Sequence, residues 1–458
     1  VSINGSSYRI PLIYNGDGIL FYRVRSAQYA ANGERKVSAW SSSFAGGLGQ
    51  YAYAGHERSL NWQSSTSFAE EGKRKTVVQY FDGTLRNRQT VTKDNSTDTT
   101  IVAETLYDKQ GRPMIQVMPS PTLSSLIGYT PLFNQTINSA EYDKSAYDTL
   151  IGLSEYCDSA SPAMSNLYGA SQYYSPNNPL KVKGFNKYIP DANDFPFRET
   201  RYTQDNTGRI ARQSGVDSFY RIGKGHETRY YYGTADQADL DALFGTEVGD
   251  ASHYQKNMVR DANGQYSVSY VDMHGRTIAT ALAGASPSSL QALSSNNNST
   301  QTDSLINKSN NIIKGSVIES VKSLLVPKSG PYQFKYALNP ASLGIADCNS
   351  QNICYDCLYD LTITITCECG GTPIIIQRSN FSLGHYDTTC NSAGNFAIDT
   401  TCTMNEGSYL VTKSLSLHED AMNWYRDSLY AIHNFCQTES SILQAQTQLI
   451  KTQLGNCQ

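Results

Sequence analysis

The chain has 458 residues and a mass of 50.5 kDa, which at roughly 150 residues per domain predicts two to four domains. Its 37 basic and 41 acidic side chains give a net charge of −4, so no basic excess supports nucleic-acid binding. The 39% hydrophobic content argues against disorder, and no run of 18 apolar residues predicts a transmembrane segment. The 32 tyrosines and 34 glycines predict turn-rich β structure.

Residues 1–60 are predicted to form an N-terminal β segment. The turn residues 15–18 precede an apolar run, residues 19–24, which predicts a short buried strand. The chain begins at Val1 and has no charged stretch followed by an apolar one, so it is interpreted as a processed protein or as part of a longer one.

Residues 61–284 are predicted to form a β-sheet region of repeated hairpins. Four segments share an aromatic residue, a nearby aspartate, a turn containing glycine, and then arginine and an alternating strand. The aspartate can accept backbone N–H groups of the turn, and the glycine is expected to take the positive-φ position. The tyrosine before each turn and the arginine after it are expected to lie close together across the strands, where a cation–π contact could form. Ordinary, unrelated β-turns are the alternative, and four matches make that alternative weaker. The turn residues are Tyr80, Asp82 and Gly83; Tyr107, Asp108, Gly111 and Arg112; Tyr202, Asp205, Gly208 and Arg209; and Tyr270, Asp272, Gly275 and Arg276.

Two parts of this region differ from the repeats. Residues 120–200 are rich in Ser, Asn, Pro and Tyr, which predicts an insertion of long surface loops with short helices. Residues 235–244 are predicted to be helical, because acidic residues lie in the first turn and Gly245 provides a stop. The Ser- and Asn-rich residues 285–329 are interpreted as a connection to the next domain.

Residues 330–458 are predicted to form a Cys-rich β-sandwich with terminal helices. Residues 361–366 alternate strictly, and residues 374–376 and 409–411 indicate further strands. Helical periodicity begins near residue 418 and predicts one helix over 421–436 and a second over 439–454.

The cysteines favour a disulfide framework in an oxidising compartment over a zinc site. Residues 1–347 contain only Cys157, whereas the rest of the chain contains nine cysteines. A zinc site usually pairs two CxxC motifs, and here a CxxC is followed by a CxC. The odd number leaves one cysteine to pair with Cys157, to pair outside this chain or to stay free. The disulfide candidates are Cys348, Cys354, Cys357, Cys367, Cys369, Cys390, Cys402, Cys436 and Cys457.

The repeated turns resemble the Rhs/YD-repeat family, in particular the large exported Rhs-like proteins of Bacteroidota. The resemblance covers roughly residues 60–290, and residues 200–284 contribute its most specific part. It implies a hollow β-shell of stacked repeats, which in this family often encloses a C-terminal toxin, and export to the cell surface or medium as a type IX secretion substrate. The repeats here are few and widely spaced, so the segment is expected to form part of such a shell, in the region that precedes the dense repeats.

No catalytic, cofactor-binding or metal-ligating residue is assigned from the sequence. His226 and Glu227 are adjacent, but the HExxH spacing of a zinc protease is absent, and a structural histidine is favoured. Neither a G-x-S-x-G elbow nor a phosphate-binding loop occurs. Residues 15–18 and 261–264 are superficially similar to calcium loops but lack the closing glutamate, which favours plain hairpin turns.

Two hypotheses about function therefore remain. The first is a non-enzymatic structural segment of a secreted or surface-exposed Rhs-like protein, which forms or plugs a β-shell and contacts the rest of a longer polypeptide or an export complex of the outer membrane. The second is a secreted, Tyr-rich carbohydrate-binding module or glycan-active enzyme.

Overall fold

A computed structural model gives the fold of most of the chain. It describes residues 5, 7–8, 10, 16–41, 49–94, 99–124, 126–147, 160–284, 288–289, 302, 304–305, 311–338, 343–346, 348–350, 352–355, 358–368, 371–382, 396–417, 423, 427 and 436–455. The chain forms two compact units, Val1–Leu150 with Ala160–Glu227 and Ile151–Ser159 with Thr228–Gln458. The predicted class, a mainly β protein with antiparallel sheets, is confirmed.

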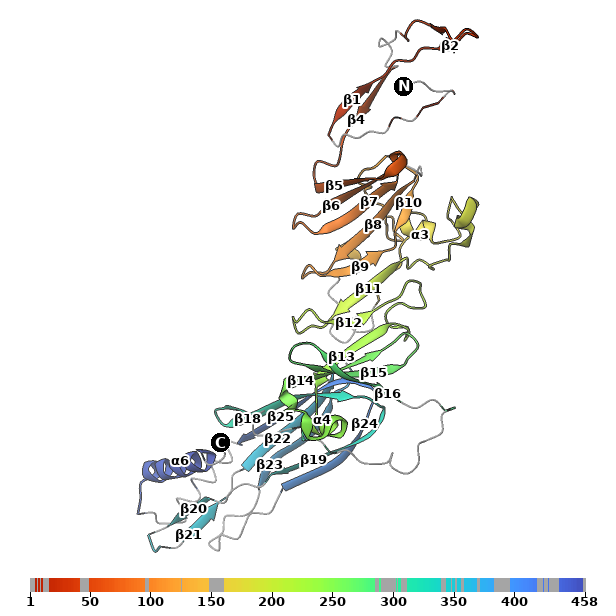
Figure 1. Cartoon of the computed structure of the whole chain (residues 1–458). Coiled ribbons are helices and arrows are strands. Elements are labelled where there is room, and N and C mark those ends of the chain that lie inside the picture. Colours follow the sequence, from red (N-terminus) through yellow and green to blue (C-terminus); the bar gives the residue numbers. More distant parts are fainter. Residues whose placement is uncertain are drawn as a thin grey trace. The chain divides into compact units, whose positions relative to one another are not determined.

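The main sheet of the first unit is antiparallel and largely follows the order of the chain (Figure 1). Its apolar core begins with Val78, Val91 and Val102, which lie opposite one another on three adjacent strands and are fully buried. This row forms because side chains alternate between the two faces of a strand. The strands in spatial order are β5 (Asn61–Phe68), β6 (Arg74–Phe81), β7 (Asn87–Asp94), β8 (Thr100–Tyr107), β9 (Pro113–Val117), β11 (Phe197–Tyr202) and β12 (Ile210–Gln213), with β10 (Ser120–Thr122) beside β8.

The predicted insertion near residues 120–200 contains the short helices α1 (Lys144–Tyr147), α3 (Gly169–Tyr173) and η2 (Gly184–Tyr188). The sequence predicted surface loops here, but some residues of the insertion are buried. Tyr142 and Met164 from this region are buried against residues of the sheet such as Leu106 and Ile115. The insertion therefore packs against the sheet and contributes buried side chains to its core.

The N-terminal segment also differs from its prediction. It contains two strand pairs, β1 (Gly18–Phe21) with β4 (Gln50–Tyr53) and β2 (Ala27–Tyr29) with β3 (Arg35–Val37). The strand expected to be buried, β1, is exposed: Ile19 and Phe21 are 56% and 60% accessible. An apolar run predicts a strand, but a two-stranded ribbon has no second layer to cover it.

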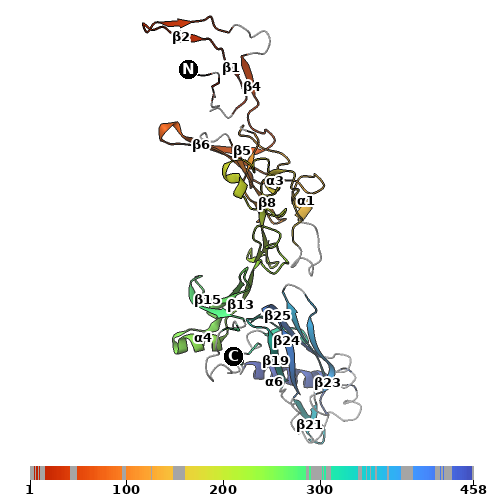
Figure 2. The same ribbon diagram turned by 90° about the vertical axis from the view of Figure 1, so that its right-hand side faces the viewer.

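The second unit begins with an antiparallel sheet of β13 (Thr228–Thr234), β14 (Tyr254–Arg260), β15 (Tyr266–Asp272) and β16 (Thr277–Ala283). Helix α4 (Gln237–Phe244) lies against this sheet (Figure 2) and buries Leu240 beside Met258 and Val268. The helix ends at Gly245, whose φ is 61°, as the sequence predicted. The 3₁₀ turns η3 (Gly245–Glu247) and η4 (Ala251–His253) lead into β14.

A β-sandwich follows in the same unit, as predicted. Apolar residues of both layers, among them Leu361, Ile365 and Ile398, form its core. The C-terminal helix α6 (Glu439–Gly455) agrees with the helix predicted over 439–454, whereas the helix predicted over 421–436 falls almost entirely outside the described residues. One layer contains β17 (Asn311–Lys314), β18 (Val317–Val326), β25 (Gly407–Leu417), β22 (Leu358–Cys367) and β23 (Ile374–Ser382), the other contains β19 (Gly330–Leu338) and β24 (Phe396–Met404), and β20 (Leu343–Ala346) pairs with β21 (Asn352–Tyr355).

The division between the compact units lies between Glu227 and Thr228, inside the predicted β-sheet region 61–284. The predicted connection, residues 285–329, contains β17 and all of β18, which lies in the sandwich between β17 and β25. Side chains join β13 to the sandwich: Ser408 donates a hydrogen bond from Oγ to the carbonyl of Tyr232 (3.3 Å), and Leu325 packs with the core beneath α4.

The cysteine prediction is confirmed for one pair. Cys348 and Cys436 form a disulfide. Cys402 carries a free thiol, which differs from the prediction that it is disulfide-bonded. The side chains of Cys157, Cys354, Cys357, Cys369, Cys390 and Cys457 lie outside what the structure describes.

Candidate functional site

The aspartate turns share one hydrogen-bonding scheme. In the turn between β8 and β9, Asp108 donates its N–H to the carbonyl of Arg112 (3.0 Å), and Gly111 donates its N–H to the carbonyl of Asp108 (2.9 Å). The carboxylate of Asp108 accepts the N–H groups of Gln110 and Arg112 through Oδ1 and the Nε–H of Arg112 through Oδ2 (2.7 Å). The carboxylate therefore fixes both the turn and the direction of the arginine.

The same scheme recurs in two further turns, between β6 and β7 and between β15 and β16. Asp82 accepts the N–H and Nε–H groups of Arg86, each at 3.0 Å. Asp272 accepts the same two groups of Arg276 at 2.9 and 2.8 Å. The N–H of Arg276 is the main cause that holds the pKa of Asp272 below its ordinary value. At Asp82 burial opposes the shift, but hydrogen bonds from Thr84 and Arg86 still lower the pKa.

Glycine occupies the left-handed position in two of these three turns. Gly111 and Gly275 have φ of 82° and 78°, as predicted. In the first turn Leu85 takes that position, with φ of 62°, and Gly83 does not have a positive φ. The prediction for Gly83 was wrong because the left-handed residue lies three positions after the aspartate, where this turn carries leucine.

The turn between β11 and β12 is a wider variant. Its strand pairing closes at Thr203, whose N–H donates to the carbonyl of Arg209 (2.8 Å). Asp205 accepts Nη2–H of Arg209 through Oδ2 (2.6 Å), and burial is outweighed by hydroxyl groups of Thr203 and Thr207 that lower its pKa. Asn206 and Gly208 both have positive φ, 60° and 75°.

A fifth turn, Asp261 to Gln265, has the scheme without the arginine. It joins β14 to β15, which confirms the plain hairpin turn favoured from the sequence. Asp261 accepts the N–H groups of Asn263 and Gln265 at 2.9 Å each, and Gly264 has φ of 87°. The turns at Asp261 and Asp272 lie at the two ends of β15.

Each arginine of the first unit's narrow turns stacks on the tyrosine of the next turn. The guanidinium of Arg86 lies 5.0 Å from the ring centre of Tyr107, and that of Arg112 lies 4.3 Å from the ring centre of Tyr202. The hydroxyl of Tyr107 donates to the carbonyl of Asn87 (2.9 Å). In the same way, the hydroxyl of Tyr202 donates to the carbonyl of Pro113 (2.9 Å).

This arrangement corrects the predicted pairing of tyrosine and arginine within one turn. Continuing the β7–β8 register, in which Gln89 lies opposite Glu104, places Arg86 directly opposite Tyr107. The register of β9 and β11 likewise places Arg112 opposite Tyr202. Residues directly opposite on adjacent strands share a face and lie about 5 Å apart, whereas the tyrosine and arginine of one turn are separated by the bulge there.

Tyr80 and Tyr270 do not join these stacks. Each lies two positions before its aspartate, an even number, whereas Tyr107 and Tyr202 lie one and three positions before theirs, so its side chain points to the opposite, buried face of the sheet. The hydroxyl of Tyr80 lies 2.7 Å from Nδ1 of His56. The hydroxyl of Tyr270 donates to Asp239 on α4 (2.9 Å), which Lys256 also contacts.

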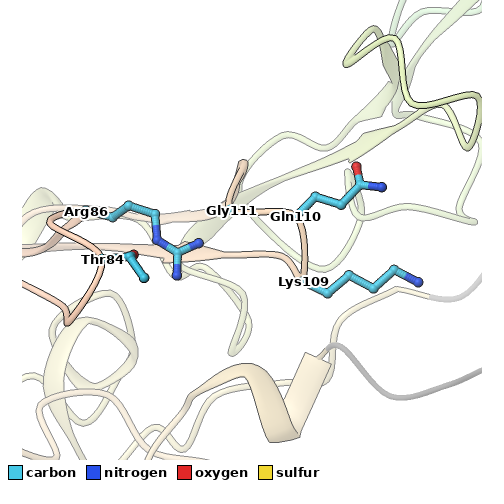
Figure 3. A pocket seen from close by; sticks show the side chains of 5 residues that line it. All are labelled: Thr84, Arg86, Lys109, Gln110 and Gly111. Atoms are coloured by element: carbon cyan, nitrogen blue, oxygen red, sulfur yellow. The ribbon is translucent and has the colours of Figure 1, made fainter.

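The stacked turns border a shallow, open hollow in the first unit. Figure 3 shows Arg86 extending from its turn toward the neighbouring one, whereas Lys109 and Gln110 extend away. A Cβ atom at Gly111 would lie 2.7 Å from Nη1 of Arg86, so glycine also makes room for the stacked arginine. The remaining lining residue is Thr84. The hollow is open to solvent, and polar side chains of the two turns line most of it.

Two buried carboxylates of the first unit, Glu104 and Glu199, are hydrogen-bonded to structural partners. Glu104 accepts hydrogen bonds from Gln89 (2.8 Å) and Asn134 (2.7 Å), and burial raises its pKa. Glu199 accepts Nε–H of Arg201 (2.5 Å) and the N–H of Ser161 (3.0 Å). The hydrogen bonds from Asn134 and Ser161 attach loop residues to the sheet.

Glu227, which adjoins His226 in the sequence, is a third buried carboxylate of this kind. It is fully buried, lies 3.7 Å from Nη1 of Arg212 and accepts the N–H of Gly225 (2.9 Å). The ring of His226 stacks on Phe219 with centroids 4.0 Å apart. The pair therefore joins the end of this unit to β12, and the structural interpretation of the histidine is the one that the geometry favours.

No group of three or more His, Cys, Asp or Glu side chains in the described part of the chain is arranged to hold a metal ion. No helix among the described residues is long and apolar enough to cross a membrane.

Comparisons with known proteins give one family match. A domain of unknown function, DUF6443, matches residues 57–234, a span that includes the turns at Asp82, Asp108 and Asp205. No curated protein matches the chain. An exo-β-1,3-galactanase from Phanerochaete chrysosporium with bound β-1,3-galactotriose is 8% identical over 87% of this chain and 90% of that chain, with a TM-score of 0.10. The galactose-bound form is 7% identical with the same coverage and TM-score. Scores this low carry no argument about fold or function.

Proposed function

We propose that this chain is a non-enzymatic structural segment of a larger exported protein of the Rhs/YD-repeat kind, in which its hairpins form or close part of a β-shell. The contact between each arginine and the next tyrosine carries this proposal. It occurs at Arg86–Tyr107 and again at Arg112–Tyr202, with the same carbonyl bond from the tyrosine. A contact repeated at a fixed register lets one hairpin position the next, which a wall built by repetition requires.

The buried charges support a structural role. A general acid or base must reach a substrate, yet Glu104, Glu199 and Glu227 are only 5%, 1% and 0% accessible. Each accepts hydrogen bonds from the protein itself. These carboxylates therefore hold loops on the sheet through the hydrogen bonds that they accept.

The partners and location follow from the same proposal. The disulfide between Cys348 and Cys436 suits an oxidising compartment, which agrees with a secreted or surface-exposed protein. The partners would be the remainder of the polypeptide and the export complex. The shell would enclose a C-terminal toxin or display an adhesive domain.

Electron cryo-microscopy of the full product of the reading frame that encodes this chain tests the proposal. The expected map shows further Tyr-Asp-Gly-Arg hairpins joined to this segment in a curved wall that surrounds a cavity. A product without further hairpins of this design would contradict the proposal. Reproducible glycan hydrolysis by the purified chain that is lost on substitution of one carboxylate would contradict the non-enzymatic role.

A further inference from the structure

The last aspartate turn is built like the first ones, but its arginine has no aromatic partner among the described residues. Asp272 holds the guanidinium of Arg276 through Nε (2.8 Å) and Nη2 (2.7 Å). The side chain of Arg276 is 75% accessible, whereas that of Arg112, which lies under Tyr202, is 20% accessible. The arginine is therefore positioned for a ring that the described part of the chain does not supply.

The strand beside this arginine has a free edge. Within the described residues, β16 pairs with β15 and no strand pairs with its other side. Thr277, the first residue of β16, lies opposite Val271 next to a bulge, as Asn87 lies opposite Phe81 and Pro113 opposite Tyr107. The carbonyls of Asn87 and Pro113 accept the tyrosine hydroxyls, so that of Thr277 occupies the equivalent position.

The turn at Asp261 provides an internal comparison. Gln265 replaces the arginine there, and the register of β15 and β16 places Gly284 opposite it, where the other turns have tyrosine. The amide of Gln265 instead donates to the carbonyl of Tyr266 (2.8 Å). Arginine and the opposing tyrosine are thus both absent from this turn and both present in two others, which indicates that the arginine marks a position for tyrosine.

We infer that the Asp272–Arg276 turn and the free edge of β16 form a docking site for one further β-strand that ends in tyrosine directly before an aspartate turn, supplied from outside this chain. The inference rests on the proposed function and names its partner. The strand would add backbone hydrogen bonds to β16. Its ring would stack on Arg276, and its hydroxyl would donate to the carbonyl of Thr277.

A synthetic peptide with the sequence of residues 100–112 of this chain is the probe, because it contains such a strand with its Tyr107 and turn. Fluorescence anisotropy would measure its binding to the full chain. We expect Arg276→Gln to weaken binding about two- to fivefold, the range of an exposed cation–π contact. A peptide with Tyr107→Leu should lose a similar factor, and the two changes together should cost little more than either alone.

Two controls locate the site. Arg198→Gln alters an exposed arginine on β11 and should leave peptide binding unchanged. A peptide with p-benzoylphenylalanine at position 107 should crosslink to residues 275–278. No saturable binding, equal binding to Arg276→Gln, or crosslinks confined to other strands would overturn the inference.

The outcome can be separated from that of the proposed function. If the peptide fails to bind but Arg112 and Tyr202 are energetically coupled within the chain, the arginine–tyrosine contact between successive turns is supported and the docking site at β16 is refuted. If Arg112 and Tyr202 are not coupled, the proposed function loses its main support whatever the peptide does.

Discussion

One backbone position in each turn, three residues after the aspartate, adopts a left-handed conformation. Leu85 has φ of 62° there, and its side chain is 68% exposed. A residue with a Cβ pays about 1–2 kcal/mol for this conformation, whereas glycine adopts it without strain. The residue at this position therefore determines how much backbone strain each turn carries.

Exchanging residues at this position should change stability in opposite directions. Leu85→Gly should raise the free energy of unfolding by about 0.5–1 kcal/mol, since relief of strain exceeds the added entropy of the unfolded chain. Gly275→Ala should lower it by about 1 kcal/mol, because its φ is 78° while no atom lies within 4 Å of the added Cβ. Urea denaturation measures both. A loss of stability in Leu85→Gly would contradict the assignment of the strained position.

His56 should make stability depend on pH. Burial lowers its pKa, and Nδ1 lies 2.7 Å from the hydroxyl of Tyr80. A pKa that is lower in the folded state than in the unfolded state, where it is about 6.5, gives stability that is present above pH 6.5 and lost as pH falls through the folded value. The difference in unfolding free energy between pH 7.5 and 5.5 should therefore be smaller in His56→Phe than in the unaltered chain. An identical pH dependence in the two proteins would show that His56 does not contribute.

At the scale of elements, buried ion pairs attach loops and strand ends to the sheet. Glu227→Ala should destabilise the first unit by about 3–5 kcal/mol, because it removes a fully buried carboxylate that pairs with the buried Arg212 and accepts the N–H of Gly225. Glu319→Ala is the matched control, since the pair of Glu319 with Lys314 is exposed and should contribute about 0–1 kcal/mol. Chemical denaturation would compare the two variants. Similar small losses in both would mean that the buried pair is not a determinant of stability.

The sequence located individual strands and helices better than it predicted which residues pack against them. Alternation located β22 and its buried Leu361, and the acidic first turn with Gly245 located α4, because local periodicity and capping decide such elements. The prediction that β1 is buried was wrong, since a strand is buried only if a second layer covers it. The aspartate turns were found from their spacing, but the partner of each arginine depends on register between strands separated by up to 90 residues, as for Arg112 and Tyr202. Sequence spacing alone does not encode that register.

At the scale of the whole molecule, the disulfide belongs to one compact unit. Cys348 and Cys436 are 88 residues apart in the sequence, and closing so long a loop in the unfolded chain is worth about 4–5 kcal/mol in the chain-entropy description. Cys436→Ser should therefore lower the Tm of the transition that unfolds the second unit and leave that of the first unit unchanged. Cys402→Ser, which alters a free thiol, should shift neither transition. Calorimetry would measure both, and an equal shift of both transitions would contradict a unit-specific role.

A double-mutant cycle on Arg112 and Tyr202 tests most directly whether successive turns are coupled. The two side chains come from turns 90 or more residues apart and meet through a 4.3 Å stack and the hydroxyl bond to Pro113. Unfolding free energies of Arg112→Ala, Tyr202→Leu and the double variant should give a coupling energy of about 0.5–1 kcal/mol. The pair Arg276 and Tyr202, which form no such stack, should give additive effects. Additivity at Arg112 and Tyr202 as well would contradict a wall built on arginine–tyrosine contacts between turns.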